Sequence, residues 1–365
     1  MSIAQTLIRS RVVEALASPH GVDRYLELVN PMWAAREVRA RVVEVRREVE
    51  VPGHPPVATL TLQPTSTWRG HRAGQHVQVG VDLPGARRAT RVFSLSSAES
   101  GAGDRFTITV RANPDGQVSK HLVSAEPGLV VHLSQAQGGF VLPDRLPDHL
   151  LLISGGSGIT PVMSMLRTLQ RRTHRGRVTF LHYAQSPAHQ IFADELAEIA
   201  RAGYGIDLHL LHPELGDPAL SPAWLGRVVP GYRDVPTWVC GPQPLVDAVR
   251  AAYVDPADPD GAPSPQLNVE WFKPPRASAG DVGGEVSFTR SGKAAVNTGA
   301  NLLEQAEALG LRPEFGCRMG ICFSCTAIKT EGTVRNVLTG ETSSLPDEQI
   351  RICVSAPDGD CSVVL

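Results

Sequence analysis

The sequence lacks long hydrophobic runs. None of its 365 residues belongs to an apolar stretch near the roughly 18 to 20 residues that a membrane-spanning helix needs. The first 21 residues mix Arg9 and Arg11 with apolar side chains, so they have no continuous apolar region of the kind that a secretory signal contains. We therefore expect a cytoplasmic protein.

Net charge and cysteine are also scarce. The 35 basic and 37 acidic side chains leave a formal charge of -2, so no chain-wide positive field is available to bind a nucleic-acid backbone. Six cysteines are too few for a disulfide scaffold in a chain of this length. Most of them crowd near the C-terminus, which is the first indication of a localised chemical site.

The pattern of apolar residues predicts a multidomain protein of the α+β and α/β classes. Residues 1–35 read as an N-terminal helical extension, and residues 36–145 alternate as expected for an antiparallel β-barrel. Residues 146–272 alternate short apolar runs with helical stretches, which predicts a parallel sheet. The proline- and glycine-rich segment 273–283 is typical of a linker, and it leaves residues 284–365 as a small third domain.

The C-terminal cysteines follow a metal-binding spacing. Cys317, Cys322 and Cys325 form C-x4-C-x2-C, and Cys353 follows after 27 intervening residues. This spacing is typical of a [2Fe-2S] cluster. Zinc is the alternative, although structural zinc sites usually combine two short pairs of ligands. The last 80 residues or so resemble the plant-type ferredoxins, which implies a β-grasp-like fold and four cysteine ligands.

Two motifs in the barrel region favour a flavin. They are RVFSLSS at Arg91–Ser97 and GQVSKHL at Gly116–Leu122. An isoalloxazine ring needs a strand edge, and a pyrophosphate needs backbone N–H groups at a helix start together with a cation, which Arg91 could supply. Taken singly, each motif is equally consistent with a surface strand or a turn before a helix.

Together these motifs resemble the ferredoxin-NADP reductase superfamily over residues 36–272. The resemblance implies FAD, with Arg91 at the diphosphate and Ser94 at flavin N5. Phe93 stands where the family usually has tyrosine, so stacking is retained but a hydroxyl contact is lost. The resemblance assigns the pyrophosphate to Gly116, Gln117, Val118 and Ser119.

Two further motifs indicate a nicotinamide dinucleotide. LLISGGSGITP places glycines between a strand and a helix that we expect Thr160 to cap, which suits a pyrophosphate, although a tight connection alone would also explain it. VCGPQPLV supplies Cys240, which is otherwise an ordinary buried cysteine. The same superfamily resemblance implies that Cys240 lies beside the transferred hydride. The residues assigned to the dinucleotide are Gly156, Ser157, Gly158, Thr160, Ser186, Cys240, Gly241 and Pro242.

The choice between NADPH and NADH depends on the segment after the second predicted parallel strand. A cation there would bind a 2′-phosphate, whereas a carboxylate would bind the ribose diol of NADH. Ser186 can hydrogen-bond a phosphate, and the next carboxylate is Asp194. We therefore expect a small preference for NADPH over NADH.

Three redox groups in one chain predict electron transfer. A nicotinamide delivers two electrons as hydride and a [2Fe-2S] cluster accepts one, so FAD is the converter between them. We expect a reductase that passes electrons to a separate acceptor. The whole chain resembles actinobacterial-type fused reductases, which implies a membrane acyl desaturase or other di-iron oxygenase as the acceptor.

Other interpretations of the same sequence stay open. The acceptor could be a haem-thiolate monooxygenase or a Rieske dioxygenase, whose reductases use the same domains. A redox sensor or scaffold without turnover is an alternative of a different class. We expect a monomer that associates with a membrane surface only through its partner.

Overall fold

The computed structural model describes residues 21–83, 88–203, 205–258, 261, 263–272, 283–316, 318–320 and 323–365. The chain forms two compact units, one ending at Glu270 and the other running from Trp271 to Leu365. Among the described residues, no helix has both the length and the apolar character needed to cross a membrane.

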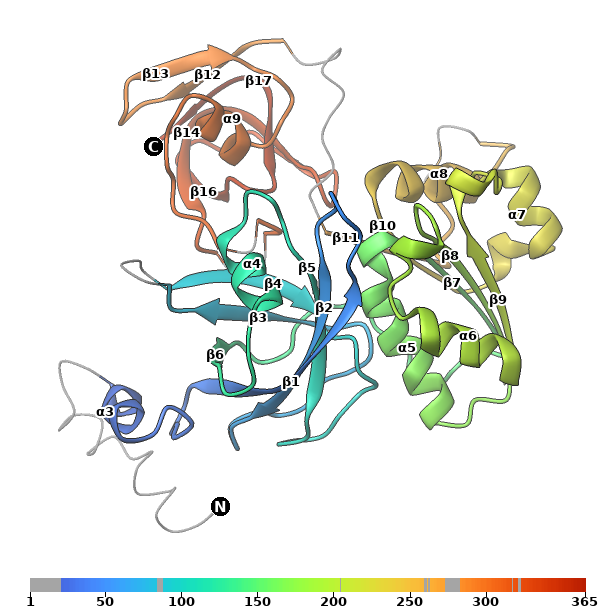
Figure 1. The fold of residues 1–365 in the computed structure, drawn as a ribbon. Helices are drawn as coiled ribbons and strands as arrows, with labels where there is room; N and C mark the ends of the chain where they lie inside the picture. The colour runs from blue at the N-terminus through green and yellow to red at the C-terminus, as the bar shows by residue number, and fades with distance from the viewer. Residues whose placement is uncertain are drawn as a thin grey trace. The chain divides into compact units, whose positions relative to one another are not determined.

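The first unit contains the antiparallel barrel that the alternating pattern predicts (Figure 1). The strands follow the order β4-β3-β6-β1-β2-β5, and each neighbouring pair is antiparallel. A bridge between Leu95 and Ile108 joins the two ends of this order and closes the barrel. The elements are β1 (Val38–Val49), β2 (Val57–Pro64), β3 (His76–Val81), β4 (Ala89–Ser94), β5 (Phe106–Arg111), β6 (Val130–Leu133) and helix α4 (Gln117–Val123).

The barrel closes around the apolar residues of its strands. Val42, Leu60 and Val79 are fully buried, and they come from three different strands. Trp68 stacks on Phe106 with 4.7 Å between ring centroids. The period-two pattern of the sequence therefore becomes one continuous core.

The second part of this unit is a five-stranded sheet in the order β11-β10-β7-β8-β9. The pairs β10/β7, β7/β8 and β8/β9 are parallel, as predicted. The order reverses between β7 and β10, which is where open α/β sheets bind their ligands. Its strands are β7 (His149–Gly155), β8 (Arg177–Tyr183), β9 (Ile206–Leu211), β10 (Thr237–Gly241) and β11 (Leu267–Trp271). Its helices are α5 (Ile159–Arg171), α6 (Ala193–Ala202), α7 (Pro222–Val228) and α8 (Gln243–Tyr253), with 3-10 turns η1 (Gly156–Gly158), η2 (Pro187–His189), η3 (Pro213–Leu215) and η4 (Tyr232–Asp234).

Helix α5 links this sheet to the barrel. Ser164 donates its hydroxyl to the carbonyl of Ser97 at 2.6 Å. The backbone N–H of Glu99 donates to the Thr168 hydroxyl at 2.9 Å, and two nitrogens of Arg172 each donate to the Glu99 carboxylate at 2.6 Å. Ser164, Thr168 and Arg172 lie on one side of the helix because they are spaced four residues apart.

The second unit is a mixed sheet with a β-grasp-like arrangement. Strand β17 is parallel to β12 and antiparallel to β14, while β13 and β16 extend the sheet on either side. Phe288, Leu303 and Ile352 form part of its buried core. The elements are β12 (Glu285–Phe288), β13 (Lys293–Val296), α9 (Leu302–Ala308), β14 (Thr326–Asn336), β15 (Thr342–Ser343), β16 (Glu348–Arg351) and β17 (Ser355–Val363).

The N-terminal extension contributes helix α3 (Val22–Val29), and the first 20 residues lie outside the described ones. The buried Asp23 carboxylate accepts hydrogen bonds from the backbone N–H groups of Ala35, Arg36 and Glu37. These bonds connect the helix to the segment that enters strand β1.

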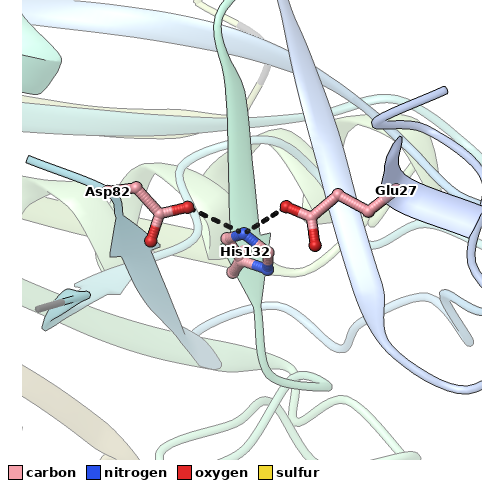
Figure 2. Close-up of side chains that lie close together, drawn as sticks. All are labelled: Glu27, Asp82 and His132. Carbon is pink, nitrogen blue, oxygen red and sulfur yellow. Dashed lines mark ion pairs between the residues drawn. The ribbon is translucent and has the colours of Figure 1, made fainter. Parts of the chain in front are cut away.

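A cluster of charged side chains lies between α3 and the barrel. Figure 2 shows His132 between Asp82 and Glu27, with its Nε2 atom 3.4 Å and 4.0 Å from their carboxylate oxygens. Arg88 pairs with Asp82 at 3.0 Å, and the buried Arg39 pairs with Glu27 at 3.2 Å. Two guanidinium groups therefore balance these carboxylates, so the cluster is an ion-pair network that links the helix to the barrel.

Candidate active site

Strand β4 carries the predicted flavin residues. Its pairing with β3 sets Arg91 opposite Val79 and Ser94 opposite His76. Ser94 is buried, while Phe93 packs at the margin of the barrel core. The first predicted flavin segment therefore lies on a well-anchored strand beside β3.

The second predicted flavin segment begins helix α4. Gly116 is the N-cap, and a Cβ at this position would lie 2.9 Å from the Ser119 hydroxyl oxygen. That oxygen accepts a hydrogen bond from the backbone N–H of Asn113 at 2.9 Å, so it holds the preceding loop. Val118 is buried in the barrel core and Gln117 is exposed. Val118 can therefore offer a phosphate only its backbone.

The predicted dinucleotide turn packs directly against the Cys-Gly-Pro loop. Strand pairing places Ser154 beside Cys240. A Cβ on Gly158 would lie 2.1 Å from the Cys240 carbonyl oxygen and 2.7 Å from the Cα of Gly241. Only glycine fits at position 158, because any side chain there would overlap the backbone of the Cys-Gly-Pro loop. Pro242 then occupies the N-cap of α8, so both loops end at helix starts.

The expected cap of helix α5 is wrong by two residues. The helix begins at Ile159 with Gly158 as its N-cap, because the preceding glycines form a 3-10 turn. Thr160 lies inside the first turn, and its hydroxyl donates to the Ser157 carbonyl at 3.0 Å. Thr160 therefore stabilises the turn from within.

Arg111 is a basic residue at this turn that sequence reasoning missed. It ends strand β5, and its Nε donates to the Ser157 hydroxyl at 3.2 Å. Burial lowers the pKa of Arg111, although an arginine still remains charged. A cation at a glycine turn complements a pyrophosphate. Its only sequence signal is a basic residue at the end of an apolar strand.

Cys240 is fully buried and lies near the carboxylate of Glu270. Burial and the charge of Glu270 raise the pKa of its thiol well above the usual range. The Glu270 Oε1 atom is 3.5 Å from Nδ1 of His76. Sequence reasoning missed both His76 and Glu270. The available signal was a carboxylate inside the apolar strand LNVEWF.

Two of the four predicted cluster ligands, Cys325 and Cys353, belong to the part of the chain that the structure describes. Cys317 and Cys322 lie outside the described residues. The sulfur atoms of Cys325 and Cys353 are 3.1 Å apart, and the backbone N–H of Gly320 donates to the Cys353 sulfur at 3.2 Å. The hydrogen bond between the Cys325 and Cys353 sulfur atoms is the main cause that lowers the pKa of Cys325 to about 6. A pair of cysteines in which one thiol ionises easily and the other sulfur accepts a backbone N–H suits iron coordination.

Cys361 differs from this pair. It is buried in strand β17, and burial raises the pKa of its thiol to about 11. A thiol that resists ionisation is a poor metal ligand. This environment supports the interpretation of Cys361 as a spectator.

A flavin motif on a barrel, a dinucleotide turn at a sheet reversal and cysteines on a β-grasp-like domain define the class: a flavin-dependent oxidoreductase with an iron–sulfur domain. Comparisons with known families agree. Residues 45–141 match the oxidoreductase FAD-binding domain, residues 152–221 the oxidoreductase NAD-binding domain, and residues 288–358 the 2Fe-2S iron-sulfur cluster binding domain.

The chain belongs to the family of reductases that combine these three domains. It is 38% identical over 356 residues to the NADPH oxidoreductase of Mycobacterium tuberculosis, covering 96% of this chain and 90% of that protein. It is 30% identical over 309 residues to the ferredoxin reductase component of 3-ketosteroid-9-alpha-monooxygenase from the same species, covering 79% and 83%. Phthalate dioxygenase reductase shares the fold, with a TM-score of 0.56, 23% identity, and coverage of 90% and 98%.

These matches confirm the predicted enzyme class and cofactors. The protein is an oxidoreductase that uses FAD, a [2Fe-2S] cluster and NAD(P)H. The roles of individual residues stay predictions, as does the link to acyl desaturases.

The close approach of Gly158 generates the first prediction. Gly158→Ala should destabilise the protein by about 3 kcal/mol and weaken dinucleotide binding, because the new methyl group overlaps the Cys240 carbonyl. Thermal unfolding and NADP+ titration measure these two effects. Gly226→Ala is the matched control, since its Cβ would lie 3.9 Å from the nearest atom, in Tyr232. Equal stability of the two variants would contradict the prediction.

The paired thiols generate the second prediction. Cys353→Ser should abolish the visible absorption of the cluster and cytochrome c reduction, while ferricyanide reduction by the flavin persists. The reason is that serine replaces a thiolate that receives the Gly320 N–H. Cys361→Ser, in the same domain, should retain the cluster. An unchanged cluster spectrum in Cys353→Ser would remove Cys353 from the ligand set.

Proposed function

We propose that this protein is an NADPH-preferring reductase that supplies single electrons to a separate oxygenase, with an acyl desaturase or another di-iron oxygenase as the first acceptor to test. The similarity to the NADPH oxidoreductase over 96% of the chain carries this proposal. Relatives with lower identity are named as reductase components of a ketosteroid monooxygenase and a glycine betaine monooxygenase. Those names support an oxygenase as acceptor, and the desaturase rests on the resemblance of the whole chain.

The geometry around Ser186 supports the preference for NADPH. Ser186 follows strand β8, and its hydroxyl oxygen is 2.8 Å from Nδ1 of the buried His189. The ring of His54 makes an edge contact with His189 at 4.5 Å between centroids. A serine hydroxyl with imidazole rings beside it favours a phosphate, because a hydroxyl and a ring N–H can both donate hydrogen bonds to phosphate oxygens.

A carboxylate also lies near this position. Glu214 accepts a hydrogen bond from the Gln185 amide at 2.6 Å. It belongs to η3, after strand β9, and the Gln185 amide occupies one of its oxygens. Glu214 is therefore the residue to test if the protein prefers NADH.

Ser186→Ala should lower kcat/KM for NADPH about tenfold and leave that for NADH nearly unchanged, because a hydrogen bond to a charged phosphate is lost. Steady-state rates with ferricyanide measure both values. Glu214→Gln is the paired variant and should not reduce the rate with NADPH. Equal losses with both nicotinamides in Ser186→Ala would contradict the assignment.

Turnover with purified acceptors tests the function itself. The protein with FAD and the [2Fe-2S] cluster bound should oxidise NADPH rapidly. It should reduce one class of acceptor, with two electrons transferred for each NADPH oxidised. The panel contains a membrane di-iron desaturase in vesicles, a Rieske oxygenase and a haem-thiolate monooxygenase. Rapid reduction by nicotinamide without transfer to any of them would remove the oxygenase proposal. Absence of rapid reduction by either nicotinamide would favour the sensor interpretation.

A further inference from the structure

Four large apolar side chains are exposed together at the N-terminal extension. Tyr25, Leu28 and Val29 lie on helix α3, where Leu28 and Val29 are 73% and 71% exposed. Trp33 follows the helix after a turn, which its N–H closes on the Asn30 carbonyl at 2.8 Å. Single exposed apolar residues are ordinary, whereas a group within nine positions needs an explanation. The other large apolar residues that are exposed in the described chain are spread over both units: Leu215, Val296, Phe323, Ile328, Leu338 and Leu345.

Helix α3 has its charged residues on the side that faces the protein. The buried and half-buried positions 22, 23, 26 and 27 alternate in pairs with the exposed positions 24, 25, 28 and 29. The inward positions hold both carboxylates of the helix, Asp23 and Glu27. A surface helix normally turns its apolar stripe toward the core. In α3 three apolar side chains are instead left outside.

Contacts on the inward side fix this orientation. Val22 and Leu26 pack with Ala35 in a small apolar cluster. The Asp23 carboxylate accepts hydrogen bonds from the backbone N–H groups of residues 35–37, and the buried Arg39 pairs with the helix at 3.2 Å through the other carboxylate. A rotation of the helix that buried its outer side would break these bonds and leave a buried charge without its partner, which is costly. The exposed apolar side is therefore a built feature of the fold.

The exposed charge on this segment is positive. Arg24 is exposed and is the i−4 neighbour of Leu28 on the helix, and Arg36 is exposed after it. Both carboxylates of residues 21–36 belong to the inward side. The next carboxylate, Glu37, pairs with Arg39 at 2.7 Å. The outer side of the helix thus suits a negatively charged surface.

The size and composition of this side favour a lipid bilayer over a protein partner. Four side chains expose on the order of a few hundred Å², whereas a stable protein interface buries roughly 800 Å² on each partner. Tyrosine and tryptophan concentrate at the boundary between water and hydrocarbon, because each joins an apolar ring to a polar group. Aliphatic side chains insert more deeply, and arginines attract anionic headgroups. All three kinds of residue are present here.

The α3 face comprises Arg24, Tyr25, Leu28, Val29 and Trp33. We propose that the α3 face docks the protein on the surface of a bilayer that contains anionic lipids. Leu28 and Val29 enter the acyl boundary, the two aromatic rings lie at the level of the headgroups, and Arg24 binds lipid phosphate. This inference goes beyond the proposed function and rests neither on reductase activity nor on the identity of the acceptor. It differs from the expectation that the chain meets a membrane only through its partner.

Binding to lipid vesicles tests the proposal without an acceptor or turnover. The full-length protein, with FAD and the cluster bound, is sedimented with vesicles of phosphatidylcholine, either alone or mixed with phosphatidylglycerol. It should bind the mixed vesicles at low salt and the neutral vesicles more weakly. High salt should remove much of this difference, because salt screens exposed charges. Absence of binding to the mixed vesicles at low salt would overturn the proposal.

Leu28→Ser should weaken binding to the mixed vesicles about tenfold, because the leucine no longer enters the acyl boundary. Arg24→Gln should weaken it about fivefold at low salt and change binding to neutral vesicles little. Leu345→Ser is the matched control, since Leu345 is a leucine of similar exposure, 65%, in the second unit. Equal rates of cytochrome c reduction should show that all three variants fold. Equal vesicle affinity of Leu28→Ser and Leu345→Ser would overturn the proposal.

Tryptophan fluorescence gives a second readout at the α3 face. All five tryptophans belong to the described residues, and Trp33 alone among them is exposed. Vesicles with brominated acyl chains should quench part of the wild-type emission, and Trp33→Phe should bind them but lose most of this quenching. Vesicle-bound wild type without any quenching would overturn the proposal. A wild-type dimer that Leu28→Ser dissociates would also overturn it, because a second copy would then cover the face.

Discussion

The site depends on the close approach of two loops, the turn after β7 and the Cys-Gly-Pro loop after β10. Gly158 lies so near the Cys240 carbonyl that a methyl group would overlap it. This contact places a helix start on each side of the sheet reversal and sets Cys240 at the junction. Helix α5 begins at the same turn and forms hydrogen bonds with the barrel at Ser97 and Glu99. One helix thus connects the nucleotide turn to the flavin-binding domain.

The same junction concentrates buried polar groups. Arg111 reaches the turn from the barrel, while His76 and Glu270 meet from opposite domains. Buried polar atoms are costly when they have no partner, so the atoms of His76 and Glu270 that lack a hydrogen-bond partner among the described residues lower the stability of this junction. The residues predicted to bind the pyrophosphate and the nicotinamide, Ser157 and Cys240, are among the residues these groups contact or influence.

Local patterns predicted the domains because each pattern reports on its own element. Alternation in the barrel strands and the short apolar runs of β7, β8 and β10 lead directly to the observed sheets. The sequence predicted Thr160 as the N-cap of α5, whereas the N-cap is Gly158. A threonine followed by proline is typical of a helix start, but here a 3-10 turn comes before the helix and the helix begins earlier. Sequence spacing also singled out Cys325 and Cys353, whose sulfur atoms meet in the structure.

The missed residues share a different property. His76 and Glu270 are almost 200 positions apart in the chain, and Arg111 reaches Ser157 from another domain. Such contacts arise from the arrangement of domains, which no local period encodes. The only sign of such a contact in the sequence is a titratable residue within an apolar strand or at its end, and this sign does not identify the contact partner.

The raised pKa of the Cys240 thiol affects how easily the protein is inactivated by oxidation. Flavoproteins that pass electrons singly can leak them to oxygen, which yields peroxide close to the site. Peroxides and alkylating reagents attack thiolates, whereas protonated thiols react slowly. Burial and the Glu270 charge raise the pKa of Cys240 and favour its protonated form, so its sulfur reacts slowly at neutral pH. A thiol at the predicted hydride-transfer position is thereby less exposed to oxidative inactivation than a thiolate would be.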